Sequence, residues 1–190
     1  MPPSPYKSMP DAEQSPTTPR KHSALHGRLL SRAQALQLLF QADNSNQTIE
    51  EVLASPYVVT EGPADEFAQI LAETTYLHRE MLDAVLQGVS SHWDINRMAL
   101  VDKNILRLSL AELLFADEIA SRAEQLGIAE SDATVDTEVA INEAVNLSKI
   151  FGGEQSFQFV NGILGRIVRD KAKGVDFLMA QAKKLNETDK

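Results

Sequence analysis

Apolar residues recur at steps of three and four along most of the chain, which is the spacing of one face of an α-helix. The first such stretch predicts a helix over about residues 25–42, with an apolar face built from Leu29, Ala33, Leu36 and Phe40. A second stretch keeps one face for over six turns between Phe67 and Val89, which predicts a single long helix starting near Ala64. No segment alternates like a strand, so we expect an all-α protein with no sheet.

Five further stretches complete the expected set of about seven helices. Thr48 with Glu51 three residues later forms the pattern of a capping box and predicts a short helix over 48–54. The stretch from about Asp102 to Phe115 is apolar on nearly all sides, which indicates a central, buried helix. We expect the next helix to be capped by Thr137 and to end at Gly152, and a further helix to follow at once. A final basic helix is expected over about 175–185.

Proline and acidic residues suggest the domain organisation. Six of the 8 Pro lie in the first 19 residues, so we expect 1–24 to be a disordered tail that includes the start of a basic arm. We predict two packed helical subdomains, over residues 25–91 and 92–170. A basic helix or tail is expected to follow over 171–190. Residues 117–136 hold many acidic side chains and one base, Arg122, so we expect an acidic insertion that forms a solvated loop, with a helical extension at its beginning as the alternative.

Composition argues against an enzyme and points to binding. The chain has no Cys, no glycine-rich phosphate loop and no His-Glu-x-x-His motif, so we expect no catalytic residues, no metal and no cofactor. No apolar run is long enough to span a bilayer, and a cytoplasmic protein is expected. The net charge is −9, yet residues 1–32 carry five basic against two acidic side chains, which leaves −12 for the remainder.

The basic arm and one aromatic residue are the candidates for contact with a nucleic acid. Arg28 and Arg32 are four residues apart on the first predicted helix, with Arg20 and Lys21 upstream. Arginine presents a planar fork suited to phosphate, but a solubilising helix end fits the spacing equally well. Phe157 and Phe159 are two apart and cannot share a helix face. One of them could stack on bases, although packing of both in the core is the simpler interpretation.

Three blocks of sequence together resemble the NusB transcription antitermination factor family. They are residues 31–41, residues 101–113, and residues 140–162, which end in Phe159-Val160-Asn161-Gly162. The resemblance covers roughly residues 25–170. It implies an all-helical fold and a noncatalytic factor that binds boxA-type RNA together with NusE, a protein of the small ribosomal subunit. Its setting would be the antitermination complex with RNA polymerase on ribosomal RNA operons.

The same resemblance implies which residues make each contact. For RNA these are Arg28, Arg32, Gln155 and Phe159, with Lys149 as a weaker candidate and Arg20 and Lys21 as additions. For NusE they are Phe40 and Asp102. Leu29 and Leu30 stand where some family members have arginines, so the basic arm is thinner in this chain.

Two alternatives remain open at the level of sequence. A similar helical module directs ribosomal RNA cytosine methyltransferases to RNA, although no cofactor loop or catalytic Cys follows Gly162 here. Some family members also associate with themselves, so a homodimer or a self-associating helical scaffold is the second alternative.

Overall fold

The computed structural model describes residues 25–55, 63–89, 94–134 and 136–171, and every regular element within these ranges is helical. The predicted all-α class is therefore confirmed. The elements are α1 (Gly27–Ser45), α2 (Ile49–Ala54), α3 (Glu66–Leu77), α4 (Arg79–Val89), the short 3₁₀ turn η2 (Ile95–Arg97), α5 (Leu100–Leu114), α6 (Ala116–Gln125), α7 (Glu130–Ala133), α8 (Thr137–Phe151) and α9 (Ser156–Lys171). The basic helix expected over 175–185 lies outside the described residues. No helix among the described residues is long and apolar enough to cross a membrane.

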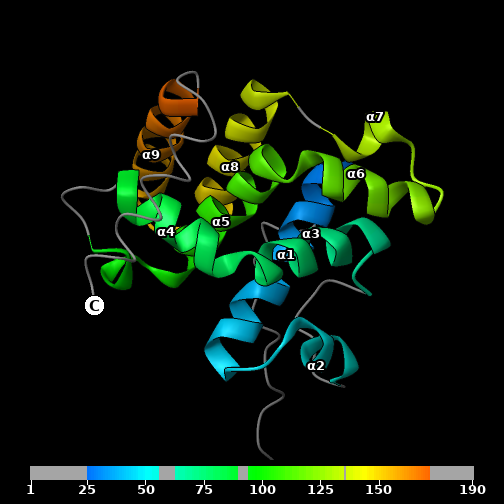
Figure 1. Ribbon diagram of the computed structural model, residues 1–190. Helices are drawn as coiled ribbons and strands as arrows, with labels where there is room; N and C mark the ends of the chain where they lie inside the picture. Colours follow the sequence, from blue (N-terminus) through cyan, green and yellow to red (C-terminus); the bar gives the residue numbers. More distant parts are fainter. Residues whose placement is uncertain (1–24, 56–62, 90–93, 135, 172–190) are drawn as a thin grey trace, which may run out of the picture.

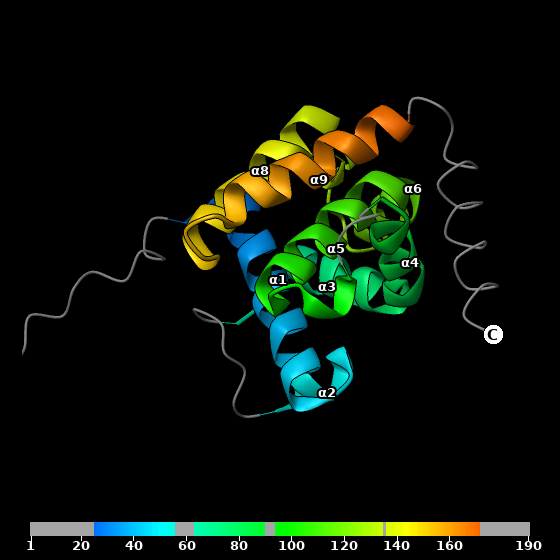
Figure 2. The same cartoon turned by 90° about the vertical axis from the view of Figure 1, so that its left-hand side faces the viewer.

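Helix α5 is the centre of the fold, as its nearly continuous apolar sequence predicts. Residues 104–113 of this helix are all buried, and it packs against α1, α3, α4, α8 and α9. Helices α8 and α9 lie side by side at one end of the molecule, whereas α2 lies at the other (Figures 1 and 2). One continuous apolar cluster runs from Ala33 in α1 to Ile167 in α9, so both halves of the chain contribute to a single core. The division into two subdomains stays a prediction.

The long helix expected between Ala64 and Val89 is wrong. The chain forms two helices, α3 and α4, which meet at His78. The imidazole of His78 stacks on the Phe115 ring at a centroid distance of 3.8 Å, and its Nε2 lies 2.8 Å from a carboxylate oxygen of Glu118. The apolar residues keep helical spacing across His78, although the helix does not continue there. The two helices do not share one buried face, and Leu77, which fits the apolar spacing, is 68% exposed. Apolar periodicity alone does not reveal such a break.

The solvated loop expected over 117–136 is also wrong, although the alternative of a helical beginning is confirmed by α6. Most of this stretch is helical in α6 and α7, and α6 packs against α3. Ile119 and Ala123 are buried, and Arg122 donates hydrogen bonds to Glu73 and Thr74 on α3. Helix α6 is amphipathic, with its acidic residues on the outer face and a short apolar stripe on the inner face. The high acidic content of the sequence makes this stripe difficult to recognise.

The predicted helix ends are mostly confirmed. The capping box of α2 is present, since the Glu51 amide donates to Thr48 Oγ1 and the Thr48 amide donates to the Glu51 carboxylate. Gly152 is the C-cap of α8. The cap expected at Thr137 is wrong by one residue, because the N-cap is Asp136 and its side chain makes no capping hydrogen bond.

Candidate nucleic-acid and protein interface

The turn between α8 and α9 is held tightly by two glycines and a serine. The Gly152 amide donates to the Ser148 carbonyl at 3.0 Å, and the Gly153 amide donates to Ser156 Oγ at 2.8 Å. A Cβ on Gly152 would lie 2.5 Å from both the Ser148 oxygen and the Ser156 Cβ. The close approach of the two helix ends therefore requires glycine at this position, and it fixes where α9 begins.

This turn forms one wall of a cavity of about 340 Å³, here named the Asp102 cavity. Its lining comes from the turn, from the first two turns of α9, from η2 and from the start of α5: Arg97, Met98, Ala99, Asp102, Gly153, Gln155, Ser156 and Phe159. The cavity brings Gln155 and Phe159, both predicted to contact RNA, together with Asp102, which was predicted to face the protein partner. Phe159 is half-buried and packs partly against the core.

Asp102 has an unusual environment in this cavity. It lies in the first turn of α5, where a negative charge is favoured by the helix dipole. The residue is 8% exposed, and its Oδ1 is buried with no hydrogen-bond partner among the described residues. Buried polar atoms in proteins are nearly always paired, so an oxygen of this kind requires an explanation.

Arg32 is not part of an exposed basic arm, which corrects the expectation drawn from its spacing to Arg28. It is 2% exposed, and its guanidinium donates three hydrogen bonds of 2.6–3.0 Å to the carboxylate of Glu112 on α5. Burial raises the pKa of Glu112, the charge and hydrogen bonds of Arg32 lower it, and the charge of Glu143 on α8 raises it further, with a net upward shift. Arg32 therefore holds α1 against α5 and is not available to phosphate.

The other basic candidates occupy different places. Arg28 is half-buried in the first turn of α1, with its guanidinium carbon 4.2 Å from the centre of the Phe67 ring on α3. Lys149 is exposed on α8, and its Nζ lies 5.8 Å from the centre of the Phe157 ring on α9. Arg20 and Lys21 lie outside the described residues.

Phe40, predicted to contact the protein partner, lines a second cavity of about 360 Å³, here named the Phe40 cavity. The other lining residues come from α1, α5 and the end of α8: Leu36, Gln37, Gln41, Asn44, Val101 and Phe151. Phe40 is 39% exposed, which is unusual for a large apolar side chain in this protein. Phe40 and Asp102 do not line the same cavity, but Val101, which precedes Asp102, lines the cavity of Phe40.

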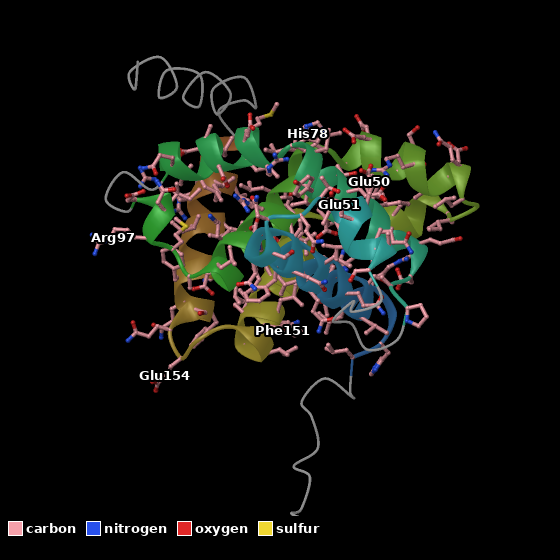
Figure 3. The ribbon with its side chains drawn as sticks, turned by 90° about the horizontal axis from the view of Figure 1, so that it is seen from below. Glu50, Glu51, His78, Arg97, Phe151 and Glu154 are labelled. Carbon is pink, nitrogen blue, oxygen red and sulfur yellow. The ribbon has the colours of Figure 1, made fainter. Side chains whose placement is uncertain are left out.

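Sequence reasoning missed Arg97 as a site residue. It lies at the end of η2, is exposed, and lines the Asp102 cavity. Figure 3 shows its side chain extending from the surface on the same side of the molecule as Glu154 of the α8–α9 turn, whereas Glu50, Glu51 and His78 lie toward the opposite side. The short segment between α4 and α5 carries no periodic signal, so only the fold reveals that this base stands beside Phe159.

Within the described ranges, no three His, Cys, Asp or Glu side chains are close enough to hold a metal ion. The arrangement instead consists of two open, mainly apolar cavities, and the Asp102 cavity also has a carboxylate, an amide and a guanidinium in its lining. Open, mainly apolar cavities on a helical surface are typical of a protein that acts by binding other molecules.

The comparisons with known proteins agree on one family. A family model described as the NusB family matches residues 30–124 and 125–169. A transcription antitermination protein NusB from Pelotomaculum thermopropionicum is 39% identical over 146 residues, which cover 74% of this chain and 88% of the relative. One from Desulforamulus reducens is 38% identical over 153 residues, covering 76% of this chain and 92% of the relative.

Solved structures show the same fold. The structure of T. maritima NusB has a TM-score of 0.57 and 29% identity, and the match covers 76% of this chain and 92% of that chain. A structure described as the antitermination factors NusB and NusE in complex with dsRNA has a TM-score of 0.54 and 24% identity, with 75% of this chain and 96% of that chain covered. The chain belongs to the NusB family.

Proposed function

We propose that this chain is a noncatalytic transcription antitermination factor that binds boxA-type RNA together with the ribosomal protein NusE. Its curated relatives carry the antitermination name and are matched over most of their own length, which favours this function over a targeting module of a methyltransferase. The observation that carries the proposal is the Asp102 cavity, in which Phe159 and Gln155 stand beside the exposed base Arg97.

The proposed RNA surface combines stacking and charge. A single-stranded base can stack on Phe159, and the exposed amide of Gln155 can donate to or accept from a base edge. Arg28 and Lys149, with Arg20 and Lys21 from the tail, are the proposed phosphate contacts. The guanidinium carbon of Arg28 lies over the Phe67 ring, and a guanidinium can stack on a ring and still donate from its edges to a phosphate. Arg32 is a positioning residue that holds the start of α1 in place.

The proposed NusE surface is centred on Phe40. A partly exposed aromatic beside an apolar cavity is typical of an interface anchor. The similar fold solved with NusB, NusE and dsRNA supports such an assembly. Asp102 is the second residue that the family resemblance predicts to contact NusE, and its neighbour Val101 lines the Phe40 cavity. The assembly would act with RNA polymerase in the cytoplasm, and self-association through the same apolar cavity is the second candidate role.

The molar mass of the complex tests this function. Light scattering on the full chain, alone and mixed with NusE and a boxA-type RNA, is expected to show one copy of each component in the ternary mixture. Phe40→Ala is expected to remove NusE from that complex. A dimer of the chain that persists unchanged in the presence of NusE and RNA would instead support the self-associating scaffold.

A further inference from the structure

A groove follows α3 on a face of the molecule that includes neither of the two cavities described above. One half, of about 430 Å³, lies between α2, the end of α3, the start of α4 and α6. The other half, of about 320 Å³, lies between α3 and the end of α6. The ion pair of Glu73 and Arg122 lines both halves, so the two adjoin there. Figure 3 shows Glu50 of this groove, here named the α3 groove, away from Arg97 of the Asp102 cavity.

The α3 groove has an exposed leucine in each half. Leu77 is 68% exposed in the first half, and Leu126 is 50% exposed in the second. They are two of the five large apolar side chains that are exposed in the described part of the chain, and Phe40 is another. Exposed apolar side chains that gather in one groove, with polar residues around them, mark a binding surface.

The lining of the α3 groove is also acidic. It holds four glutamates and two arginines, and Glu50 and Glu66 are exposed to solvent. Both arginines already have partners, since Arg122 pairs with Glu73 and Arg79 stacks on an aromatic ring of α3. A partner that combines apolar side chains with positive charge would therefore suit this groove.

Residues 172–190, which follow α9 and lie outside the described residues, have such a sequence. Between residues 173 and 185 there are three lysines and one aspartate, a net charge of +2. A helix of this length is marginal in water on its own, so it needs a surface against which to pack. Apolar residues recur there at the spacing of one helix face, namely Val175, Leu178, Ala182 and Leu185.

The end of α9 places this segment within reach of the α3 groove. Helix α9 packs against α4, whose first residue, Arg79, lines the groove. Figure 2 shows the last turn of α9 on the side of the molecule where α4 and α6 lie. Three residues of connection and a helix over 175–185 span about 26 Å, whereas α4 is only about 16 Å long. Because the segment is covalently attached, its effective concentration at the groove is on the order of millimolar, and a weak contact suffices.

We propose that residues 172–190 of this same chain dock in the α3 groove as an amphipathic helix. The apolar face of the segment would cover Leu77 and Leu126, and its lysines would lie near the acidic lining. Docking would explain why Leu77 keeps the apolar spacing of the sequence although no described residue covers it. The inference concerns a face other than the proposed RNA and NusE sites and does not depend on either.

Hydrogen exchange of the full chain, measured on the amides of residues 175–185, tests the docking. These amides should be protected in the wild type, because a docked helix opens only rarely. Leu77→Lys places a positive charge where the basic segment would lie, and it should speed their exchange by about tenfold or more. Leu77 is largely exposed, so this variant is expected to keep the fold.

Matched controls test each side of the contact. Val139→Lys makes the same change at an exposed residue of α8 that does not line the groove, and it should leave the protection intact. Within the segment, Leu178→Ser should remove the protection. Phe177→Ser should keep it, because the neighbouring position lies on the opposite face of the helix.

Three outcomes would overturn the inference. Amides of 175–185 that exchange freely in the wild type would show that the segment does not dock and would leave the groove to a separate basic protein. Protection that is equal in the wild type and in Leu77→Lys would place the segment on another surface. Protection that disappears on dilution would show that the groove holds the segment of a second copy. Protection that is independent of concentration, lost in Leu77→Lys and Leu178→Ser and kept in both controls, is the result we expect.

Discussion

Arg32 and Glu112 form a buried ion pair that joins the first helix to the central one. Three hydrogen bonds of 2.6–3.0 Å connect the guanidinium on α1 to the carboxylate on α5, although the residues are 80 positions apart in the sequence. Glu143 on α8 adds a second negative charge near the pair, and its buried Oε2 has no partner among the described residues. The pair thus fixes the first part of α1 against α5.

Breaking this pair from one side should be far more costly than removing both partners. Arg32→Met leaves the Glu112 carboxylate buried without a counter-ion, which is expected to lower the free energy of unfolding by about 3–5 kcal/mol. The double variant Arg32→Met with Glu112→Leu should recover most of that loss, because it leaves no buried charge at this site. Urea denaturation of the three proteins measures both effects. Equal losses in the single and double variants would show that the pair contributes little beyond its packing.

The same comparison predicts a dependence on pH. Burial raises the pKa of Glu112 despite the opposing effect of Arg32, so the folded protein binds that proton more tightly than the unfolded chain does. Lowering the pH toward the ordinary range of glutamate should therefore favour folded wild type over the double variant, which lacks the group. We expect the stability difference, wild type minus double variant, to increase as the pH falls from 7 to about 5. A difference that stays constant or decreases would contradict this assignment.

The acidic stretch over 117–136 should be required for stability, contrary to the expectation from its charge. Ile119 is 1% exposed between α6 and α3, so Ile119→Ala is expected to cost about 2–4 kcal/mol. The exposed neighbour Asp117 offers a control, since Asp117→Ala should change the stability by less than about 0.5 kcal/mol. Replacing the whole stretch with a Gly/Ser linker should lower the melting temperature sharply, and an unchanged value would restore the interpretation of a dispensable loop.

Gly152 should tolerate no larger residue. Its backbone angles, φ −84° and ψ 176°, are open to any amino acid, so the constraint is space and not conformation. In Gly152→Ala the new methyl group would overlap the Ser148 carbonyl and the Ser156 side chain, which forces α8 and α9 apart. We expect reduced stability and weaker RNA binding together. Gly162 is the control, because a Cβ there meets nothing within 4 Å.

The helices themselves could be predicted from the sequence because each buries an apolar stripe of regular period. This was enough for α1, α2, α5 and α8, including the capping box and the glycine at the end of α8. The break at His78 could not be predicted, because it depends on contacts with Phe115 and Glu118, which are distant in the sequence. Periodicity marks a face of a helix but does not say whether two consecutive helices share that face.

The sequence could not show which charged side chains are buried or with which partners they pair. Arg28 and Arg32 are both arginines and stand four residues apart on α1. Arg28 is nevertheless half-buried against Phe67, whereas Arg32 is fully buried and paired with Glu112. Arg107 is a second example, because it lies buried on α5 between Asp43 and Asp83. Burial would lower its pKa, but the hydrogen bonds and charges of the two aspartates outweigh that effect and raise it. Such partners are found only once the fold brings distant segments together.

Phe40 should contribute to binding and little to folding. Its side chain is 39% exposed, so Phe40→Ala removes less buried area than truncation of a core residue such as Leu38 would. Interface anchors of this kind typically lose 2 kcal/mol or more of binding energy on truncation, or about a thirtyfold rise in Kd. Calorimetric titration with NusE, beside a thermal melt of the free variant, tests both statements. A large drop in melting temperature with unchanged affinity would identify Phe40 as a structural residue.

The salt dependence of RNA binding tests the central claim most directly. Phosphate contacts release counterions, so their contribution falls as salt rises, whereas stacking on an aromatic depends on salt far less. With NusE present and boxA-type RNA as ligand, Arg28→Ala should reduce the affinity and flatten the slope of log K against log salt by about one. Phe159→Ala should reduce the affinity at every salt concentration by about 1–3 kcal/mol and leave the slope close to that of wild type. If Phe159→Ala binds this RNA as tightly as wild type does across the whole salt range, the Asp102 cavity is not the RNA site and the account is contradicted.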